Sequence, residues 1–209
     1  MATRTQIVKK AYKCLDEVYP DTPLSSDIEE FRVADFVDDA IRFIGRVAPV
    51  RALGEGAQLT LSKTNDYTYS INVLGGSFVR LISIKMSDWD LPITDTFYTD
   101  HPRYKQQADP ILKGSIKRPI VFVSNSNTLE IYSSGGSVDE ARGFIVDKGS
   151  NVIIGPNGSV VSGTYTHNYP DQLSEAIAWK TVELVLSAMN DAQGVQFAQA
   201  QLKQLLEAL

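Results

Sequence analysis

The spacing of apolar residues changes twice along this 209-residue chain, and this change constrains the fold more than any other feature. Apolar residues recur every three or four positions over residues 4–19, and again from about residue 28 to Pro49, which predicts amphipathic helices. Alternating apolar and polar residues then dominate the middle of the chain, which predicts strands. Helical spacing returns after Pro170 and continues to Leu209. We therefore predict an α+β fold.

The two predicted N-terminal helices carry start signals. Thr3 with Gln6, and Ser26 with Glu29, have the spacing of capping boxes. The segment 171–189 is apolar nearly all round, so we expect neighbouring helices or another subunit to surround it. The last helix combines a leucine stripe with a glutamine-rich face, which we expect to be solvated.

Strand signals fill the middle of the chain. The residues Ser124–Asn127 separate two short apolar runs and predict a β-hairpin. Glycines at 75 and 76 supply a turn, and residues 88–118 are irregular and interrupted by prolines. The predicted strands cover residues 57–62, 67–73, 78–86, 120–123 and 128–132, with weaker ones at 144–146 and 152–154.

These elements predict one domain over residues 1–209. Residues 1–52 and 171–209 are expected to pack together as a helical bundle, and residues 53–170 to form a β-rich insertion between them. The length is sufficient for a sizeable hydrophobic core.

Composition excludes several classes of protein. The net charge of −5 argues against a dedicated nucleic-acid binder that neutralises many phosphates. Cys14 is the single cysteine, so no internal disulfide can form, and with only His101 and His167 as further soft ligands a zinc site is not expected. Because a disulfide scaffold is excluded, we expect assembly in a cytosolic environment. No apolar run is long enough to span a membrane, and the N-terminus lacks the apolar run of a signal peptide.

One cluster could carry catalysis. Asp95, Asp100 and His101 could hold a metal ion or form a hydrolase site. We expect instead a turn before Pro102, with solvated or capping acids. Cys14 is expected to pack in or near the core. We therefore expect no enzyme, and no catalytic, cofactor-binding or metal-binding residues.

Charge is unevenly distributed along the chain. Residues 171–209 hold five carboxylates and two lysines, so the helical end is acidic. A basic segment opposite an acidic one can join copies or partners head to side. A possible contact to DNA or to a neighbouring ring is the basic segment 103–118, with Arg103, Lys105, Lys113, Lys117 and Arg118 against Asp109.

Several ordered phrases resemble head–tail connector proteins of tailed phages. The strand and turn at 78–89 are similar to a family phrase F-L-R-L-V-S-x-K-M followed by Trp. A proline-interrupted stretch at 91–107 follows, and then Gly114–Pro119 matches a G-x-x-x-x-P step into a hairpin. The phrases 37–43 and 176–186 are similar too. The resemblance covers about residues 28–209 and is closest to adaptor or ring proteins of short-tailed and crAss-like phages.

This resemblance implies a structural virion protein at the head–tail junction, present in the host cytoplasm during assembly. It implies a ring of about twelve copies that docks below the portal protein, extends the channel through which DNA passes at ejection, and carries further tail or ring proteins. No membrane partner and no cofactor are implied. The implied portal or subunit interface is the terminal helix, with Val195, Phe197, Leu202, Leu205, Leu206 and Leu209.

An alternative reading is a β-rich module that binds glycan or peptide. It predicts a monomer with a concave aromatic pocket. Its candidate residues are Tyr67, Tyr69, Trp89, Tyr98 and Tyr104.

Overall fold

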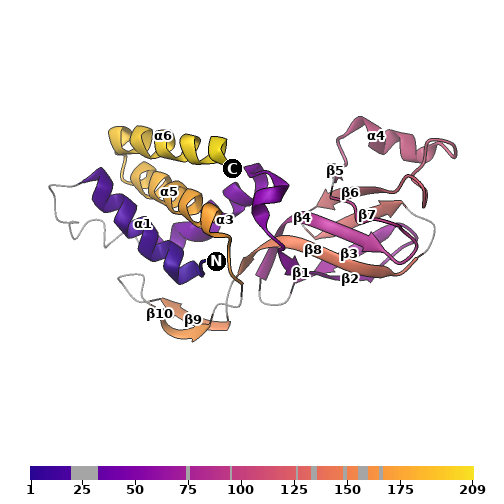
Figure 1. The fold of residues 1–209 in the computed structure, drawn as a ribbon, viewed down its shortest axis with the longest axis horizontal. Helices are drawn as coiled ribbons and strands as arrows, with labels where there is room; N and C mark the ends of the chain where they lie inside the picture. Colours follow the sequence, from indigo (N-terminus) through magenta and orange to yellow (C-terminus); the bar gives the residue numbers. More distant parts are fainter. Residues whose placement is uncertain are drawn as a thin grey trace. The chain divides into compact units, whose positions relative to one another are not determined.

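A computed structural model shows an α+β protein with helices at both ends of the chain and strands between them, as the sequence predicts (Figure 1). The chain divides into two compact units, which are described separately. The helical unit joins Met1–Gly54 to Val146–Leu209, and the β-rich unit is Glu55–Ile145. The structure describes residues 1–19, 33–73, 76–94, 96–125, 127–132, 136–147, 150–154, 160–164 and 167–209.

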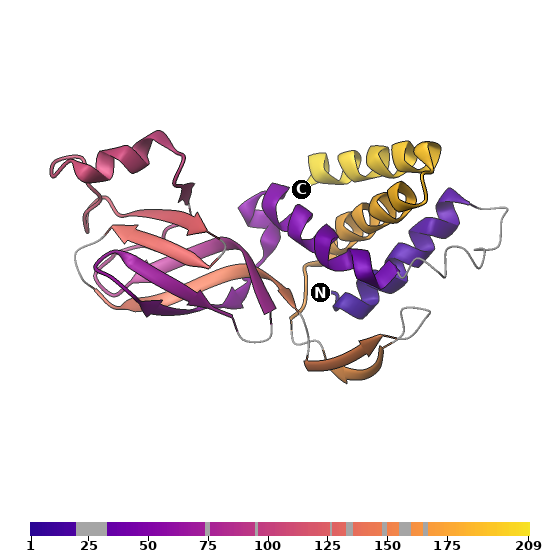
Figure 2. The same ribbon diagram turned by 180° about the vertical axis from the view of Figure 1, so that it is seen from behind.

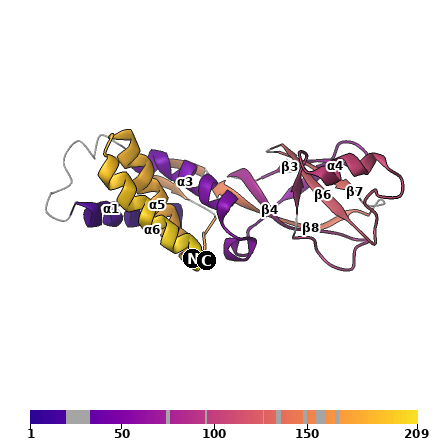
Figure 3. The same ribbon diagram turned by 90° about the horizontal axis from the view of Figure 1, so that it is seen from above.

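The helical unit is a bundle built around one central helix, α5. Helix α5 packs against α1, α3 and α6, as the views from behind and above show (Figures 2 and 3). This confirms that neighbouring helices surround the segment that is apolar on nearly all sides. The unit contains α1 (Arg4–Val18), α3 (Val33–Val47), the 3-10 helix η1 (Val50–Leu53), the hairpin of β9 (Ser150–Ile154) and β10 (Val160–Thr164), α5 (Asp171–Ala188) and α6 (Ala192–Ala208).

The core of the bundle follows the predicted helical faces. Ile7 and Leu15 of α1 and Ile41 of α3 are fully buried, as are Ile177 and Val182 of α5. Burial of each such side chain stabilises the fold by about 1.5–3 kcal/mol relative to its exposure. Helices α1 and α5 lie far apart in the sequence. They pack together because contact between them removes the apolar faces of both from water.

Polar contacts fix the start of α1. The Thr3 backbone N–H donates to Gln6 Oε1 at 2.8 Å and the Gln6 N–H donates to Thr3 Oγ1 at 3.3 Å, which confirms the first predicted capping box. Arg4 is buried and donates to Asp38 Oδ1 at 2.7 Å and to the Ala34 carbonyl at 2.8 Å, both in α3. The second predicted capping box, Ser26 with Glu29, lies outside the described residues.

The β-rich unit contains two sheets. One has the strand order β1-β8-β4 and the other has the order β2-β3-β7-β6-β5. The elements are β1 (Ala57–Gln58), β2 (Thr60–Lys63), β3 (Thr68–Asn72), β4 (Gly76–Met86), β5 (Phe97–Tyr98), α4 (Pro102–Lys105), the 3-10 helix η2 (Gln106–Ala108), β6 (Ile120–Asn125), β7 (Thr128–Tyr132) and β8 (Val138–Asp147).

Buried residues of the two sheets form one hydrophobic core. Leu81 and Ile84 of β4 enter it from one sheet, and Val121 of β6 and Leu129 of β7 enter it from the other. The predicted hairpin is confirmed, because β6 and β7 are antiparallel with Val123 opposite Leu129. The consecutive strands β3 and β4 lie in different sheets. Of the two glycines predicted to form a turn, Gly76 is the first residue of β4, and Gly75 lies outside the described residues.

The unit boundaries compare with the predicted ones in two ways. The first boundary, after Gly54, lies close to the predicted position after residue 52. The second lies after Ile145, well before residue 170. The reason is a set of contacts inside the helical unit: the Asp147 N–H donates to the Tyr169 hydroxyl at 3.0 Å, and the Tyr169 N–H donates to the Ala2 carbonyl at 2.8 Å. The prediction of a single domain over residues 1–209 stays a prediction.

Candidate functional site

The terminal helix α6 uses much of its apolar stripe inside its own unit. Leu202 is only 6% exposed, so most of its side chain packs within the bundle. Val195, Leu205, Leu206 and Leu209 are half-buried. Phe197 is 43% exposed and its ring contacts Trp179 edge-on, with 5.8 Å between the ring centroids.

A groove of about 400 Å³ runs between α3, α5 and α6. Its apolar part includes Phe43, which is 40% exposed, and Leu206. We call it the α3/α5/α6 groove; its lining residues are Phe43, Lys180, Glu183, Gln199, Leu202, Lys203, Leu206 and Glu207.

Paired charges are among the lining residues of this groove. Lys180 Nζ lies 2.8 Å from Glu183 Oε2 and 4.2 Å from the centroid of the Phe43 ring. Lys203 Nζ lies 3.9 Å from Glu207 Oε1. Both lysines are therefore balanced by carboxylates, and the charged side chains that line the groove sum to zero.

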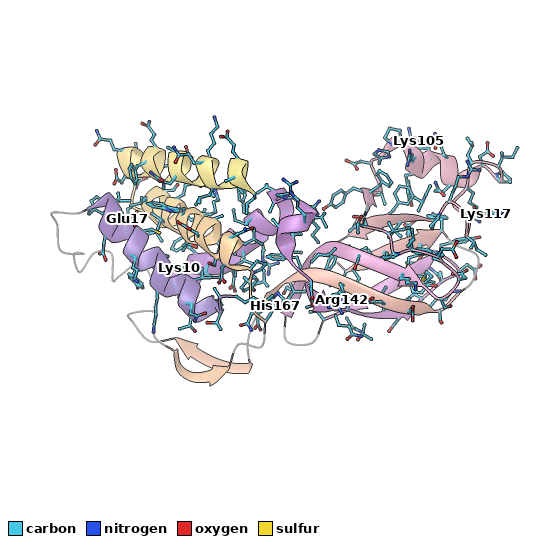
Figure 4. The ribbon with its side chains drawn as sticks, viewed as in Figure 1. Lys10, Glu17, Lys105, Lys117, Arg142 and His167 are labelled. Carbon is cyan, nitrogen blue, oxygen red and sulfur yellow. The ribbon has the colours of Figure 1, made fainter. Side chains whose placement is uncertain are left out.

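The basic segment 103–118 begins within α4 of the β-rich unit and continues into the loop that follows it. The Arg103 guanidinium lies 5.2 Å from the centroid of the Phe97 ring. Lys113 Nζ donates to the Tyr67 hydroxyl and lies 4.0 Å from the centroid of that ring. Lys105, Lys117 and Arg118 are exposed, and Figure 4 shows the first two at the α4 end of the unit.

Hydrogen bonds within this segment hold its backbone in place. The buried Gln107 donates from Nε2 to the Arg103 carbonyl and accepts at Oε1 from the Gly114 N–H, both at 2.9 Å. Asp109 Oδ1 accepts from the Ile111 N–H at 2.8 Å. The Ser115 and Arg118 backbones exchange two hydrogen bonds of 3.0 Å. The segment is a fixed loop, because side chains and backbone both satisfy its polar groups.

The tip of this loop exposes apolar side chains that the sequence analysis missed. Ile111 is 80% exposed, Leu112 is 50% exposed and Ile116 is 44% exposed. The signal was present in the sequence as three aliphatic residues without helical or strand periodicity, between Pro110 and Pro119. We call residues 109–118 the apolar-basic loop.

A cluster of aromatic rings packs the basic segment 103–118 against the five-stranded sheet. Glu130 on β7 accepts from the Tyr104 hydroxyl at 3.1 Å and from the Tyr132 hydroxyl at 2.9 Å. The pKa of Tyr132 and of Tyr104 is raised, first by burial and then by the Glu130 carboxylate. The rings of Tyr67 and Tyr132 stack at 5.0 Å, and Tyr104 meets Phe122 edge-on at 5.2 Å.

A hollow of about 430 Å³ lies beside this cluster. We compare its lining with the aromatic pocket that the sequence predicts for a module that binds glycan or peptide. Of the predicted residues, Tyr67 and Tyr104 line the hollow. Tyr69 and Trp89 were wrong as binding residues, because they are buried in the core of the unit. Tyr98 is 56% exposed and does not line it, whereas Tyr132, which was not predicted, does.

The candidate catalytic residues are not brought together as a site in the described structure. His101 begins α4, where its Nδ1 accepts from the Arg103 N–H at 3.2 Å, and its ring lies 4.4 Å from that of Phe97. Asp100 is exposed, and Asp95 lies outside the described residues. Over the described ranges, no group of three or more His, Cys, Asp or Glu residues is arranged to hold a metal ion.

Cys14 packs on α1 as predicted. It is 7% exposed, and burial, reinforced by Glu17, raises the pKa of its thiol to about 12. A thiol in this state is a poor nucleophile at neutral pH.

In the part of the chain that the structure describes, no helix combines the length and the hydropathy that crossing a bilayer requires. No protein-family model matches the sequence, and no curated protein matches it. The function is therefore argued from the surfaces of the two units.

Proposed function

We propose that this chain is a structural subunit of a head–tail adaptor ring in a tailed phage. The ring docks below the portal protein, extends the DNA channel and presents a platform for the next tail component. Its mechanism is geometric, because contacts between unlike patches on neighbouring subunits close a ring on a symmetric portal. The sequence resemblance of residues 28–209 motivates this proposal.

One observation carries the proposal furthest: apolar side chains are exposed on two separate surfaces. Phe43 and Phe197 are 40% and 43% exposed in the helical unit. Ile111 and Leu112 are exposed at the loop of the β-rich unit. Exposed aliphatic and aromatic groups of this kind are typical of protein–protein contacts, and two such surfaces fit a subunit that has more than one neighbour.

The terminal helix supports portal docking through fewer residues than the sequence suggested. Phe197 is the most exposed of its apolar side chains, whereas Leu202 belongs to the bundle. We therefore assign portal contact to the exposed part of α6, centred on Phe197.

Electron microscopy tests this proposal. Portal rings from the same genome would be incubated with the purified chain and imaged with and without it. The expected result is an added ring of density coaxial with the portal, and it is expected to be lost in Phe197→Asp. Val47→Asp, which changes an equally exposed residue on α3, serves as the matched control and is expected to keep the added ring. Portal rings that stay bare would contradict the proposal.

The hollow beside Tyr67, Tyr104 and Tyr132 favours a second candidate, a module that binds glycan or peptide. Aromatic faces next to Lys105 and Lys113 suit a sugar ring or an acidic peptide. It is the weaker candidate, because these groups already have partners within the unit: Tyr104 and Tyr132 donate to Glu130, and Lys113 donates to Tyr67. A glycan and peptide array tests it, with Tyr104→Ala expected to abolish any specific binding found.

A further inference from the structure

The hollow beside the tyrosine cluster of the β-rich unit has a positively charged lining. Its described lining residues include Lys105 and Lys113 and no Asp or Glu; the others are three tyrosines, a glutamine and an alanine. In the α3/α5/α6 groove, by contrast, each lysine is paired with a glutamate. The volume of about 430 Å³ lies within the range of ligand pockets. The hollow therefore suits a ligand that brings negative charge.

Hydrogen-bond donors without an acceptor gather in this hollow. The Tyr67 hydroxyl accepts from Lys113 Nζ, so its own hydrogen is left to donate. Lys113 retains two further N–H donors after this bond. Within the described part of the chain, the Lys105 side chain has neither a hydrogen bond nor an ion pair. A ligand with charged oxygen acceptors would satisfy all three groups, and hydrogen bonds of that kind are the strong ones.

The carboxylate of Glu130 is engaged by two of the tyrosines. Its Oε1 accepts from the Tyr104 hydroxyl at 3.1 Å and its Oε2 accepts from the Tyr132 hydroxyl at 2.9 Å. Glu130 does not itself line the hollow. It offsets part of the positive charge from behind the tyrosines, and it leaves the two lysines without a carboxylate partner of their own.

The surroundings of the hollow add further positive charge. Arg103, Lys117 and Arg118 are exposed, and none of the three forms an ion pair with the residues that the structure describes. Asp109 is the one carboxylate in residues 103–118. Figure 4 shows Lys105 and Lys117 at the same end of the unit. A ligand with several negative charges therefore fits this surface better than one with a single charge.

Exposed aliphatic side chains beside the hollow indicate a protein ligand. Ala108 and Lys113 line the hollow, and the residues between them include Ile111, which is 80% exposed, and Leu112, which is 50% exposed. Contacts to nucleic acid are made mainly to phosphates and sugars, which give no reason to expose aliphatic groups. Gln107 fixes the loop through the Arg103 carbonyl and the Gly114 N–H, so binding requires little ordering of the loop.

We propose that this hollow binds a carboxylate from an acidic, leucine-containing segment of a partner protein. Lys105, Lys113 and the Tyr67 hydroxyl hold the carboxylate, and aliphatic residues of the same segment cover Ile111 and Leu112. The inference rests on the proposed ring function, in which a further tail component docks on the subunit, and it names the chemistry of that partner.

Fluorescence anisotropy with labelled peptides and the full chain tests the ligand chemistry. The probe is a short peptide of alternating Glu and Leu. Two control peptides replace every Glu by Gln or every Leu by Ser, and each is expected to bind at least about tenfold more weakly. Absence of binding by the Glu–Leu peptide, or equal binding of the Glu and Gln forms, would overturn the inference.

Variants of the hollow test where the peptide binds. Lys105→Met breaks no side-chain contact within the described structure, and Tyr67→Phe keeps the ring and removes the hydroxyl. Each is expected to weaken binding of the Glu–Leu peptide by about fivefold or more. Lys63→Met, at an exposed lysine of the same unit outside the hollow, is the matched control for charge and is expected to bind as the wild type does. Circular dichroism verifies that the three variants are folded.

Two outcomes with these variants would overturn the inference. One is an equal loss of binding in Lys63→Met and Lys105→Met, which would show that only the net charge matters. The other is a duplex DNA probe that binds through Lys105 while the peptides do not, which would assign the hollow to phosphate.

The portal separates this inference from the proposed function. Rings that form on the portal from a chain that does not bind the Glu–Leu peptide would overturn the carboxylate site and leave the ring function standing. A chain that binds the peptide through Lys105 and Tyr67 but leaves portal rings bare would support the site and contradict the ring function.

Discussion

Tyr19 and Asp191 join the end of the first helix to the start of the last. The Tyr19 hydroxyl donates to Asp191 Oδ2, while Asp191 Oδ1 accepts from the backbone N–H groups of Gln193 at 3.1 Å and Gly194 at 3.0 Å. One carboxylate therefore caps α6 and holds α1. These hydrogen bonds lower the pKa of Asp191, and burial followed by the bond to Asp191 raises the pKa of Tyr19 to about 12.

Removal of this carboxylate is expected to destabilise the helical unit. Asp191→Ala loses the cap of α6 and the partner of Tyr19, and we expect a loss of about 1–2 kcal/mol in the free energy of unfolding. Asp191→Asn keeps an oxygen acceptor for the cap and is expected to cost less. Urea denaturation followed by circular dichroism measures both. Equal losses in the two variants would show that the cap contributes little.

A second prediction concerns acid. Burial lowers the pKa of His167, against the opposing effect of the Asp147 carboxylate, which accepts from the backbone N–H of His167 at 2.6 Å. Below the ordinary histidine pKa of about 6.5 the unfolded chain therefore binds a proton that the folded chain does not. Stability is expected to fall as pH drops through that value toward the lower folded pKa.

Thermal unfolding at about pH 7.5 and about pH 5.5 measures this effect. The melting temperature of the wild type is expected to fall more between these two conditions than that of His167→Gln, which cannot titrate. His101 and the carboxylates are common to both proteins, so the difference isolates His167. An identical decrease in the two proteins would contradict the assignment.

Gly56 is expected to resist substitution. Its φ of +69° is disfavoured for other residues, and an added Cβ would lie 2.5 Å from Ile82 Cδ1 and 2.7 Å from the Gly143 carbonyl oxygen. Gly56→Ala is therefore expected to cost about 1–3 kcal/mol. The neighbouring change Glu55→Ala removes a side chain that is 87% exposed, and we expect it to cost less than about 0.5 kcal/mol. Comparable urea midpoints for the two variants would refute the steric argument.

Cys14 gives a prediction about reactivity. Its pKa of about 12 leaves almost no thiolate at neutral pH, and the side chain is buried. Labelling by a thiol reagent is expected to be slow in the folded protein and rapid in denaturant. Rapid labelling of the folded chain would show that the N-terminal end of the bundle opens.

The sequence predicted those features that depend on contacts between residues close together in the chain. Thr3 and Gln6 lie within one helical turn, and Ser124–Asn127 join adjacent strands, so both features depend on short-range contacts. Strand β5 was missed, because Phe97 and Tyr98 form a strand only by pairing in parallel with Phe122 and Val123. The start of β8, around Asp139 and Glu140, was also missed, since its polar sequence carries no strand signal.

The candidate sites were only partly predictable for a related physical reason. Helical spacing groups Leu202 with Leu205 and Leu206 on one face, but it cannot tell whether that face meets α5 or another protein. Leu202 is buried within the unit, whereas the exposed Phe197 lies beside the stripe. Likewise, Glu130 gained its role because it accepts from Tyr104, which lies in another element, as well as from Tyr132.

The central claim is that this chain is a ring subunit that docks on a portal, and mass photometry of the chain with and without the portal from the same genome tests it most directly. The account predicts a species of about twelve copies, formed alone or only when the portal is present. A chain that stays monomeric in both samples, with the portal mass unchanged, would contradict it.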